Sequence, residues 1–229
     1  MVQHLPPEEL LLDYATGTLA EPLSLLVATH VTLSPESRRQ VREFESIGGA
    51  LLESVEPAEM APGALDAALA EIDAAPDAGG DEAAGPAERP RAADASGPSG
   101  TAASVPTPLR TYVQRNFDAL PWRERGSNVA EFDLLPDYPG YKTRLLRIRA
   151  GAKVPQHTHA GGEYTLVLEG SFTDETGRFA RGDVAVADAD VTHQPVAGSE
   201  GDCICLAVTD APLKMTGPLG RILNYFVDM

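Results

Sequence analysis

Residues 151–170 read GAKVPQHTHAGGEYTLVLEG, and this stretch decides the expected fold of the second half of the chain. His157 and His159 stand two positions apart, so on an extended strand both side chains leave the same face. Glu163 follows a short Ala-Gly-Gly turn and can return from the next strand, while His193 lies farther along, in GDVAVADADVTHQP. Three imidazoles and one carboxylate that converge make a good site for a first-row transition metal. We therefore expect these four residues to bind a metal.

The spacing of this stretch resembles the cupin motif, G-x5-H-x-H-x3-E-x6-G, with the histidine of the second cupin motif supplied by His193. Every interval of the first motif is kept between Gly151 and Gly170. The resemblance implies a small antiparallel β-barrel with one divalent transition metal inside. Zinc is the metal expected first, and iron, manganese and nickel are the alternatives. Zinc with four protein ligands would form a closed structural site, whereas a metal with five or six ligands would keep positions open for water, dioxygen or substrate.

The rest of residues 109–229 has the pattern of short strands. The runs YKTRLLRIRAG, EYTLVLEGSF, GDVAVAD and DCICLAV are apolar or alternating, and Gly, Pro and Asp divide them. Many short strands separated by turn residues are typical of a sandwich or barrel. We predict an α+β multidomain fold, in which a small helical bundle is followed by an antiparallel β-barrel of the cupin, or jelly-roll, type.

Cys203 and Cys205 lie two positions apart in DCICLAV and are the only cysteines of the chain. On a strand they share one face, which would suit a redox sensor or a thiol pair near the metal. Their spacing on one extended strand is poor for a disulfide, because the Cα atoms lie near the upper limit of acceptable separation. Free cysteines are also common as simple buried apolar residues, so both interpretations stay open.

The segment from Pro76 to Ser104 separates the two halves. Its 29 residues contain no Val, Ile, Leu, Met, Phe, Tyr or Trp. A segment with nothing to bury cannot offset the entropy lost on ordering, so we predict a disordered linker over residues 76–108.

The first half, residues 1–75, reads as helices. PPEELLLDYATG opens with prolines and acids, which suit a helix start, and reaches Gly17, a typical stop. EPLSLLVATHVTL repeats apolar residues at helical intervals, with His30 on the apolar stripe. A third helix is expected from Ser34 to about Glu53 and a fourth in LDAALAEIDAA. Three of these can form a small bundle, and the fourth suits a partner-binding element.

The charge of the chain disfavours direct binding to nucleic acid. The formal net charge is −16, and residues 1–75 hold 13 acidic side chains against three arginines. Phosphate attraction needs a basic face, so the acidic first half better suits a basic protein partner, or only confers solubility. No apolar run approaches the roughly 18 residues of a membrane helix, and the N-terminus lacks a basic signal-peptide region. With only two cysteines, the cytoplasm is the expected location, and the oligomeric state stays open.

Taken together, HLPPEELLLDYATGTL, HVTLSPESRRQV and the motif of the second half resemble the ChrR-type anti-sigma factors. The resemblance covers nearly the whole chain except the linker. It implies that the helical domain sequesters an extracytoplasmic-function (ECF) sigma factor, and that the metal-bound cupin releases it after a signal such as singlet oxygen or a related oxidant. Ligand loss, cysteine oxidation, proteolysis of the linker and domain rearrangement are all compatible with release. An Fe- or Mn-dependent dioxygenase with an accessory helical domain is the alternative function, and a binding module that carries no signal is a third.

The stretch THVTLSPESRR departs from the family pattern. In that pattern two histidines and two cysteines bind zinc; here His4 and His30 match the histidines, whereas Ser34 and Ser37 occupy the cysteine positions. A neutral hydroxyl is a weak zinc ligand compared with a thiolate. In Ser-Pro-Glu, however, Ser34 suits the N-cap of a helix and Pro35 its first position. We therefore expect no zinc in the helical domain.

Overall fold

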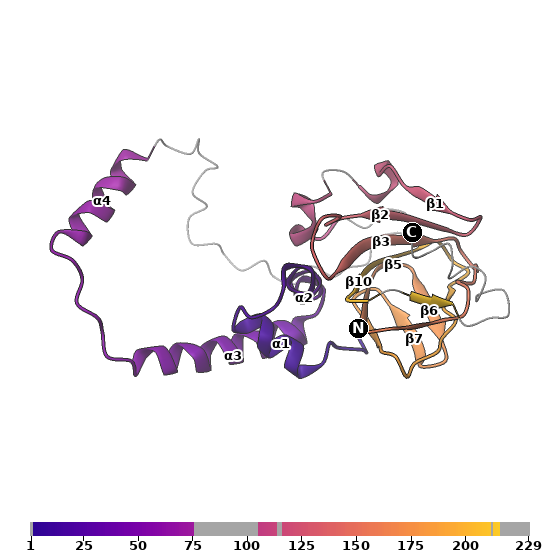
Figure 1. Ribbon diagram of the computed structural model, residues 1–229, viewed down its shortest axis with the longest axis horizontal. Helices are drawn as coiled ribbons and strands as arrows, with labels where there is room; N and C mark the ends of the chain where they lie inside the picture. Colours follow the sequence, from indigo (N-terminus) through magenta and orange to yellow (C-terminus); the bar gives the residue numbers. More distant parts are fainter. Residues whose placement is uncertain (1, 76–104, 114–115, 212, 216–229) are drawn as a thin grey trace, which may run out of the picture. The chain divides into compact units, whose positions relative to one another are not determined.

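The computed structural model describes residues 2–75, 105–113, 116–211 and 213–215 (Figure 1). The chain divides into two compact units, one within residues 1–49 and 102–229 and the other within residues 50–101. Most of the predicted linker, residues 76–104, lies outside the described residues. Its last residues are described, and there Val105 is already buried. Described structure thus includes residues before the predicted boundary at 108.

Four α-helices occupy the first part of the chain, as predicted (Figure 1). They are α1 (Glu8–Ala15), α2 (Glu21–Leu33), α3 (Pro35–Glu53) and α4 (Ala64–Ala74). Glutamates in the first turns of α1, α2 and α3 complement the positive end of each helix dipole. Gly17 ends α1 in the left-handed region, with φ of 73°, where a side chain would be strained.

The helices do not form a core of their own. Leu11 of α1 and Leu26 and Val27 of α2 are fully or almost fully buried, and they belong to one apolar cluster with residues of the second half. Leu109, in the 3-10 helix η1 (Thr107–Thr111), joins that cluster, and α2 also contacts strand β10 (Cys203–Thr209). The short helices α1 and α2 therefore bury their apolar faces together with the barrel and not in a core confined to the helices.

The second half contains one large antiparallel sheet. Its strand order is β1-β2-β3-β10-β5-β8. The strands are β1 (Arg123–Arg125), β2 (Val129–Asp133), β3 (Lys142–Ile148), β5 (Glu163–Glu169) and β8 (Val184–Ala187), together with β10. The predicted strand runs correspond to β3, β5, β8 and β10, which confirms the pattern-based assignment of short antiparallel strands.

Smaller sheets complete the barrel. One has the order β7-β6-β9, formed by β7 (Gly177–Ala180), β6 (Ser171–Asp174) and β9 (Val196–Ala197). The other pairs β11 (Leu213–Met215) with β4 (His157–His159), and a 3-10 helix, η2 (Phe117–Ala119), precedes β1. A second apolar cluster lies inside, in which Val167 and Cys203 of the large sheet pack with Phe172 and Phe179. The result is the predicted antiparallel barrel.

The glycine that ends the 151–170 motif has a structural reason. Gly170 adopts a φ of 67° at the turn between β5 and β6. A Cβ atom there would stand 2.5 Å from the carbonyl oxygen of Asp202. A larger residue would therefore force this turn away from Asp202, which directly precedes β10, the strand next to β5 in the sheet.

None of the helices in the described residues combines the length and apolar character needed to span a membrane.

Candidate metal centre

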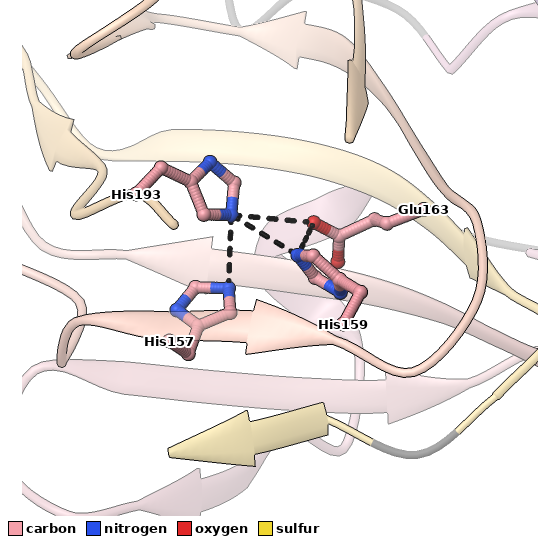
Figure 2. Close-up of side chains that lie close together, drawn as sticks. All are labelled: His157, His159, Glu163 and His193. Carbon is pink, nitrogen blue, oxygen red and sulfur yellow. Dashed lines mark hydrogen bonds and ion pairs between the residues drawn. The ribbon is translucent and has the colours of Figure 1, made fainter. Parts of the chain in front are cut away.

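The fold brings the four predicted ligands together inside the barrel (Figure 2). His157 and His159 flank Thr158 on the short strand β4, and Glu163 is the first residue of β5. His193 lies opposite His157, and their backbones exchange two hydrogen bonds, of 3.1 and 3.0 Å. His193 is not part of a regular strand, and these two backbone hydrogen bonds fix its position opposite His157. All four side chains are buried.

The atoms that face one another are the donors a metal would use. The Nε2 atom of His193 lies 3.1 Å from Nε2 of His157 and 3.1 Å from Nε2 of His159. A carboxylate oxygen of Glu163 lies 3.2 Å from Nε2 of His159 and 3.8 Å from Nε2 of His193. One ligand atom from each of the four residues lies within 4.8 Å of the others. Donors bound to one metal at about 2.1 Å stand roughly 3.0–3.4 Å apart, so the spacing fits a single ion.

Neighbouring groups set the tautomers of two of these histidines. Nδ1 of His157 donates to the carbonyl oxygen of Pro155 at 2.8 Å, and Nδ1 of His193 donates to Asp174 at 3.0 Å. In neutral rings this leaves both Nε2 lone pairs directed at each other across 3.1 Å. Such an arrangement is repulsive unless a cation lies between the lone pairs. The donor set therefore fits a divalent metal, with Asp174 and the Pro155 carbonyl as the supporting partners that metal-binding histidines usually have.

The pKa values agree with a site prepared for a cation. Burial lowers the pKa of His157, and burial followed by the neighbouring His157 and His193 lowers that of His159 to about 4. Both rings are therefore neutral near pH 7, which is the form that binds metals. Burial also raises the pKa of Glu163, and the neighbouring His193 and Arg144 oppose this shift only in part.

Cys205 of the predicted cysteine pair lines the same interior space as His157, Glu163 and His193. The sulfur atoms of Cys203 and Cys205 are 3.5 Å apart, and both residues are free and buried on β10. The contact with Cys203, and then burial, raise the pKa of the Cys205 thiol well above its ordinary value. A thiol with a raised pKa holds little thiolate and is a poor nucleophile. Their role as a redox pair stays a prediction.

Three of the four residues of the degenerate N-terminal site lie together. His30, Ser34 and Ser37 are almost completely buried. Nδ1 of His30 donates to the carbonyl oxygen of Gly182 at 2.9 Å, so its Nε2 accepts from the Ser37 hydroxyl at 2.8 Å. Ser34 donates its hydroxyl to that of Ser37 and accepts from the Ser37 backbone N–H, each at 3.3 Å. The predicted N-cap role of Ser34 is confirmed.

His4 does not join this network in the part of the chain that the structure describes. Its ring packs against Phe179, with the ring centroids 4.4 Å apart. Its backbone is held by the buried Asp183, whose Oδ1 accepts from the N–H groups of Gln3 and His4 at 2.6 and 3.0 Å. Neither Asp183 nor Asp174 was identified from the sequence. An aspartate in a turn is usually a local turn former, and no spacing signal connects these two to distant residues.

An antiparallel barrel with a buried His3Glu cluster, joined to a small set of helices, defines a cupin-type protein with a candidate metal centre. Residues 111–212 match the family model described as the ChrR cupin-like domain. The chain is 38% identical over 225 residues to the anti-sigma-E factor ChrR of Cereibacter sphaeroides, covering 98% of each protein. It therefore belongs to the ChrR family.

A solved structure supports the same assignment over nearly the whole chain. The crystal structure of Rhodobacter sphaeroides SigE in complex with the anti-sigma ChrR matches with a TM-score of 0.74 and 36% sequence identity. The match covers 92% of this chain and 100% of the matched chain. Helices and barrel are thus both part of the family architecture.

Proposed function

We propose that this chain is an anti-sigma factor that sequesters an ECF sigma factor and releases it under oxidant stress. The observation that carries the proposal is the full-length similarity to ChrR, a protein named as an anti-sigma factor and crystallised with SigE. Its site of action would be the cytoplasm, where sigma factors meet RNA polymerase. The similarity extends over helices and barrel alike, which favours a regulator over the alternative of a cupin dioxygenase with an accessory domain.

Exposed apolar residues on α3, on α4 and between them support a protein partner. On α4, Leu65, Leu69 and Ile72 follow helical spacing along one face, and none of the residues of α4 is buried. An amphipathic helix with an uncovered apolar face is a common way to bind a partner. The full set of large exposed apolar residues in this region is Ile47, Leu51, Leu52, Val55, Met60, Leu65, Leu69 and Ile72.

We assign different roles to the two halves of the chain. Residues 1–75 would bind the sigma factor, and the cupin domain within 109–229 would carry the signal. We propose zinc as the resident metal of His157, His159, Glu163 and His193, in keeping with three nitrogen donors and one oxygen donor. When bound, such an ion supplies a positive charge that holds the four ligands in one arrangement.

Co-purification of the full chain with its cognate ECF sigma factor tests the first part of the proposal. We expect a stable complex, and we expect Leu69→Glu to weaken it at least tenfold because a charge would enter the apolar stripe. Ala67→Glu provides the matched control, because at 100° per residue Ala67 lies on the opposite side of α4. Absence of a complex, or equal binding by both variants, would contradict the proposed function.

The sensory part needs a separate experiment. The complex is exposed to singlet oxygen from an illuminated photosensitiser, and the free sigma factor is measured over time. We expect Glu163→Gln to alter release while leaving the initial complex intact, because the ligand lies in the barrel and not on α4. Release that is identical in wild type and variant would exclude the metal site from signalling.

A further inference from the structure

A cavity of about 530 Å³ lies inside the barrel next to the candidate metal centre. The ligands His157, Glu163 and His193 form part of its wall. Volumes of 300–1,000 Å³ are typical of sites for small organic molecules. The cavity therefore has room for a molecule much larger than water, and the proposed function leaves this space unexplained.

The residues opposite one another in the sheet explain why the space is open. On the inner face, Thr165 of β5 pairs with Ala185 of β8, and Glu163 pairs with Ala187. Thr165, Ala185 and Ala187 all line the cavity. Small side chains at these positions leave the interior unfilled, whereas most barrels of this size fill their interior with larger residues.

Strand β3 contributes two cations to the wall, Lys142 and Arg144. The Arg144 side chain is only 10% exposed, and its Nη1 contacts Glu131 at 3.2 Å. Its Nε is buried without a hydrogen-bond partner in the described part of the chain. Lys142 forms no ion pair with any described residue, and burial, followed by the charge of Arg144, lowers the pKa of its ammonium group. Both cations thus have capacity for an additional anion.

The carboxylates of the wall already have other partners. Glu131 accepts from Arg125 at 2.6 Å and from Arg123 at 2.8 Å. Burial opposes its ionisation, but these hydrogen bonds and the charge of Arg144 outweigh it and lower the pKa of Glu131 to about 2. Asp174 is bonded to His193, and Glu163 belongs to the metal cluster. A divalent ion in the cluster would leave the wall with an excess of positive charge, inside a chain whose net charge is −16.

Much of the remaining wall is apolar, with Val129, Leu146, Ile148 and Phe172 among its residues. We propose that the cavity binds a small monocarboxylate with an apolar body, its carboxylate paired with Arg144 and Lys142. Such a ligand satisfies the open donors at one end and covers apolar surface at the other. The inference rests on the proposed sensory role and deepens it, because it names the class of molecule that the sensor domain takes.

Isothermal titration calorimetry of the metal-loaded full chain with octanoate tests the inference. Octan-1-ol and inorganic phosphate are the matched probes, since one lacks the charge and the other the apolar body. We expect octanoate to bind at least tenfold more tightly than either. Equal or tighter binding of octan-1-ol or phosphate, or no binding of octanoate, overturns the inference.

Two variants test which side chains bind the carboxylate of octanoate. Arg144→Met is expected to weaken octanoate binding at least tenfold, and Lys142→Met several-fold. Lys142 stands at the end of β3 and is more exposed than Arg144, so its variant remains informative if Arg144→Met fails to fold. Arg147→Met is the control, because Arg147 alternates to the other face of β3 and lies over the Trp122 ring at 4.9 Å. Unchanged binding in Lys142→Met and in a folded Arg144→Met overturns the assignment. Sigma-factor binding is measured separately, so failure of the ligand proposal is distinguishable from failure of the proposed function.

Discussion

The hydroxyl of Ser37 donates a hydrogen bond to Nε2 of His30 across 2.8 Å, and both side chains are fully buried. A zinc ion bound to His30 would need the same lone pair. The hydroxyl of Ser37 therefore satisfies the imidazole of His30 without a metal. The two serines therefore have a structural role.

Ser37→Ala is expected to destabilise the protein by about 1–3 kcal/mol. The substitution leaves Nε2 of His30 buried without a partner, and an unsatisfied buried acceptor costs about that much. Urea unfolding at pH 7.5 measures the change. Ser46→Ala is the control, because the Ser46 hydroxyl is exposed and bonds only within its own helix. A difference below 0.5 kcal/mol between the two variants would mean that the Ser37 hydrogen bond contributes little.

The double variant Ser34→Cys, Ser37→Cys is expected to gain one zinc ion per chain. The hydroxyls of Ser34 and Ser37 are 3.3 Å apart beside Nε2 of His30, so two thiolates there would supply three donors with that nitrogen. Elemental analysis of the purified full chain counts the metal. Ser46→Cys serves as the control for nonspecific thiol binding. No gain over that control would contradict the expected site, whose fourth family position, His4, packs against Phe179 in this structure.

The wild-type chain is expected to contain one divalent metal ion, held in the barrel. Removing the Nε2 donor in His193→Gln should lower the content to nearly zero, since the three remaining donors bind far less tightly. His4→Gln should keep the wild-type content. Elemental analysis of the three full-length proteins decides the matter. Two ions in the wild type would contradict our interpretation of Ser34 and Ser37.

Much of this arrangement could be predicted from local sequence. His157 and His159 of the 151–170 motif are close together in the chain. The alternation of side chains along a strand was therefore enough to predict that both lie on one face. The helix start at Ser34 and Pro35 could be predicted in the same way, because it depends only on neighbouring residues. The partners of the site could not be found in this way. Asp174 reaches His193 across 19 positions, and Gly182 reaches His30 across 152. Such contacts depend on strand register and packing, which composition and periodicity do not encode.

The same limit applies to the cavity. Arg144 and Lys142 looked like ordinary polar positions in the run YKTRLLRIRAG. Only the register of β3 with β10 and β2 places them on the inner face, beside Glu131 and across the sheet from Glu163. The shared core of helices and barrel was also not predictable, because an apolar stripe on a helix does not specify what covers it.

The stability of the protein is expected to decrease as the pH falls through about 6.5, in part because of His30. Burial lowers the pKa of His30 below 6.5, with the hydrogen bond to Gly182 and the charge of Asp183 opposing the shift less strongly. Between the lowered pKa of His30 in the folded chain and its ordinary pKa of 6.5 in the unfolded chain, the unfolded chain binds more protons, so acid favours unfolding. Above pH 6.5 the neutral His30 makes its full contribution to stability. Urea unfolding at pH 7.5 and pH 5 should show a smaller loss for His30→Gln than for wild type. An equal loss would assign the pH dependence to other groups.

Asp183→Ala is expected to release the N-terminal segment from the barrel. The carboxylate accepts from the backbone N–H groups of Gln3 and His4 through Oδ1 and from Ala180 through Oδ2, the last at 2.8 Å. Hydrogen bonds to a charged group contribute about 1.5–3 kcal/mol each, so the loss of three should lower the unfolding free energy by about 4.5 kcal/mol or more. Hydrogen exchange at Gln3 and His4 should accelerate by at least tenfold. Asp202→Ala is the control, since Asp202 is exposed and accepts a single backbone N–H, from Ala150. If exchange at Gln3 and His4 stays slow in Asp183→Ala, the pairing of the Val184 N–H with the His4 carbonyl is sufficient to hold the segment.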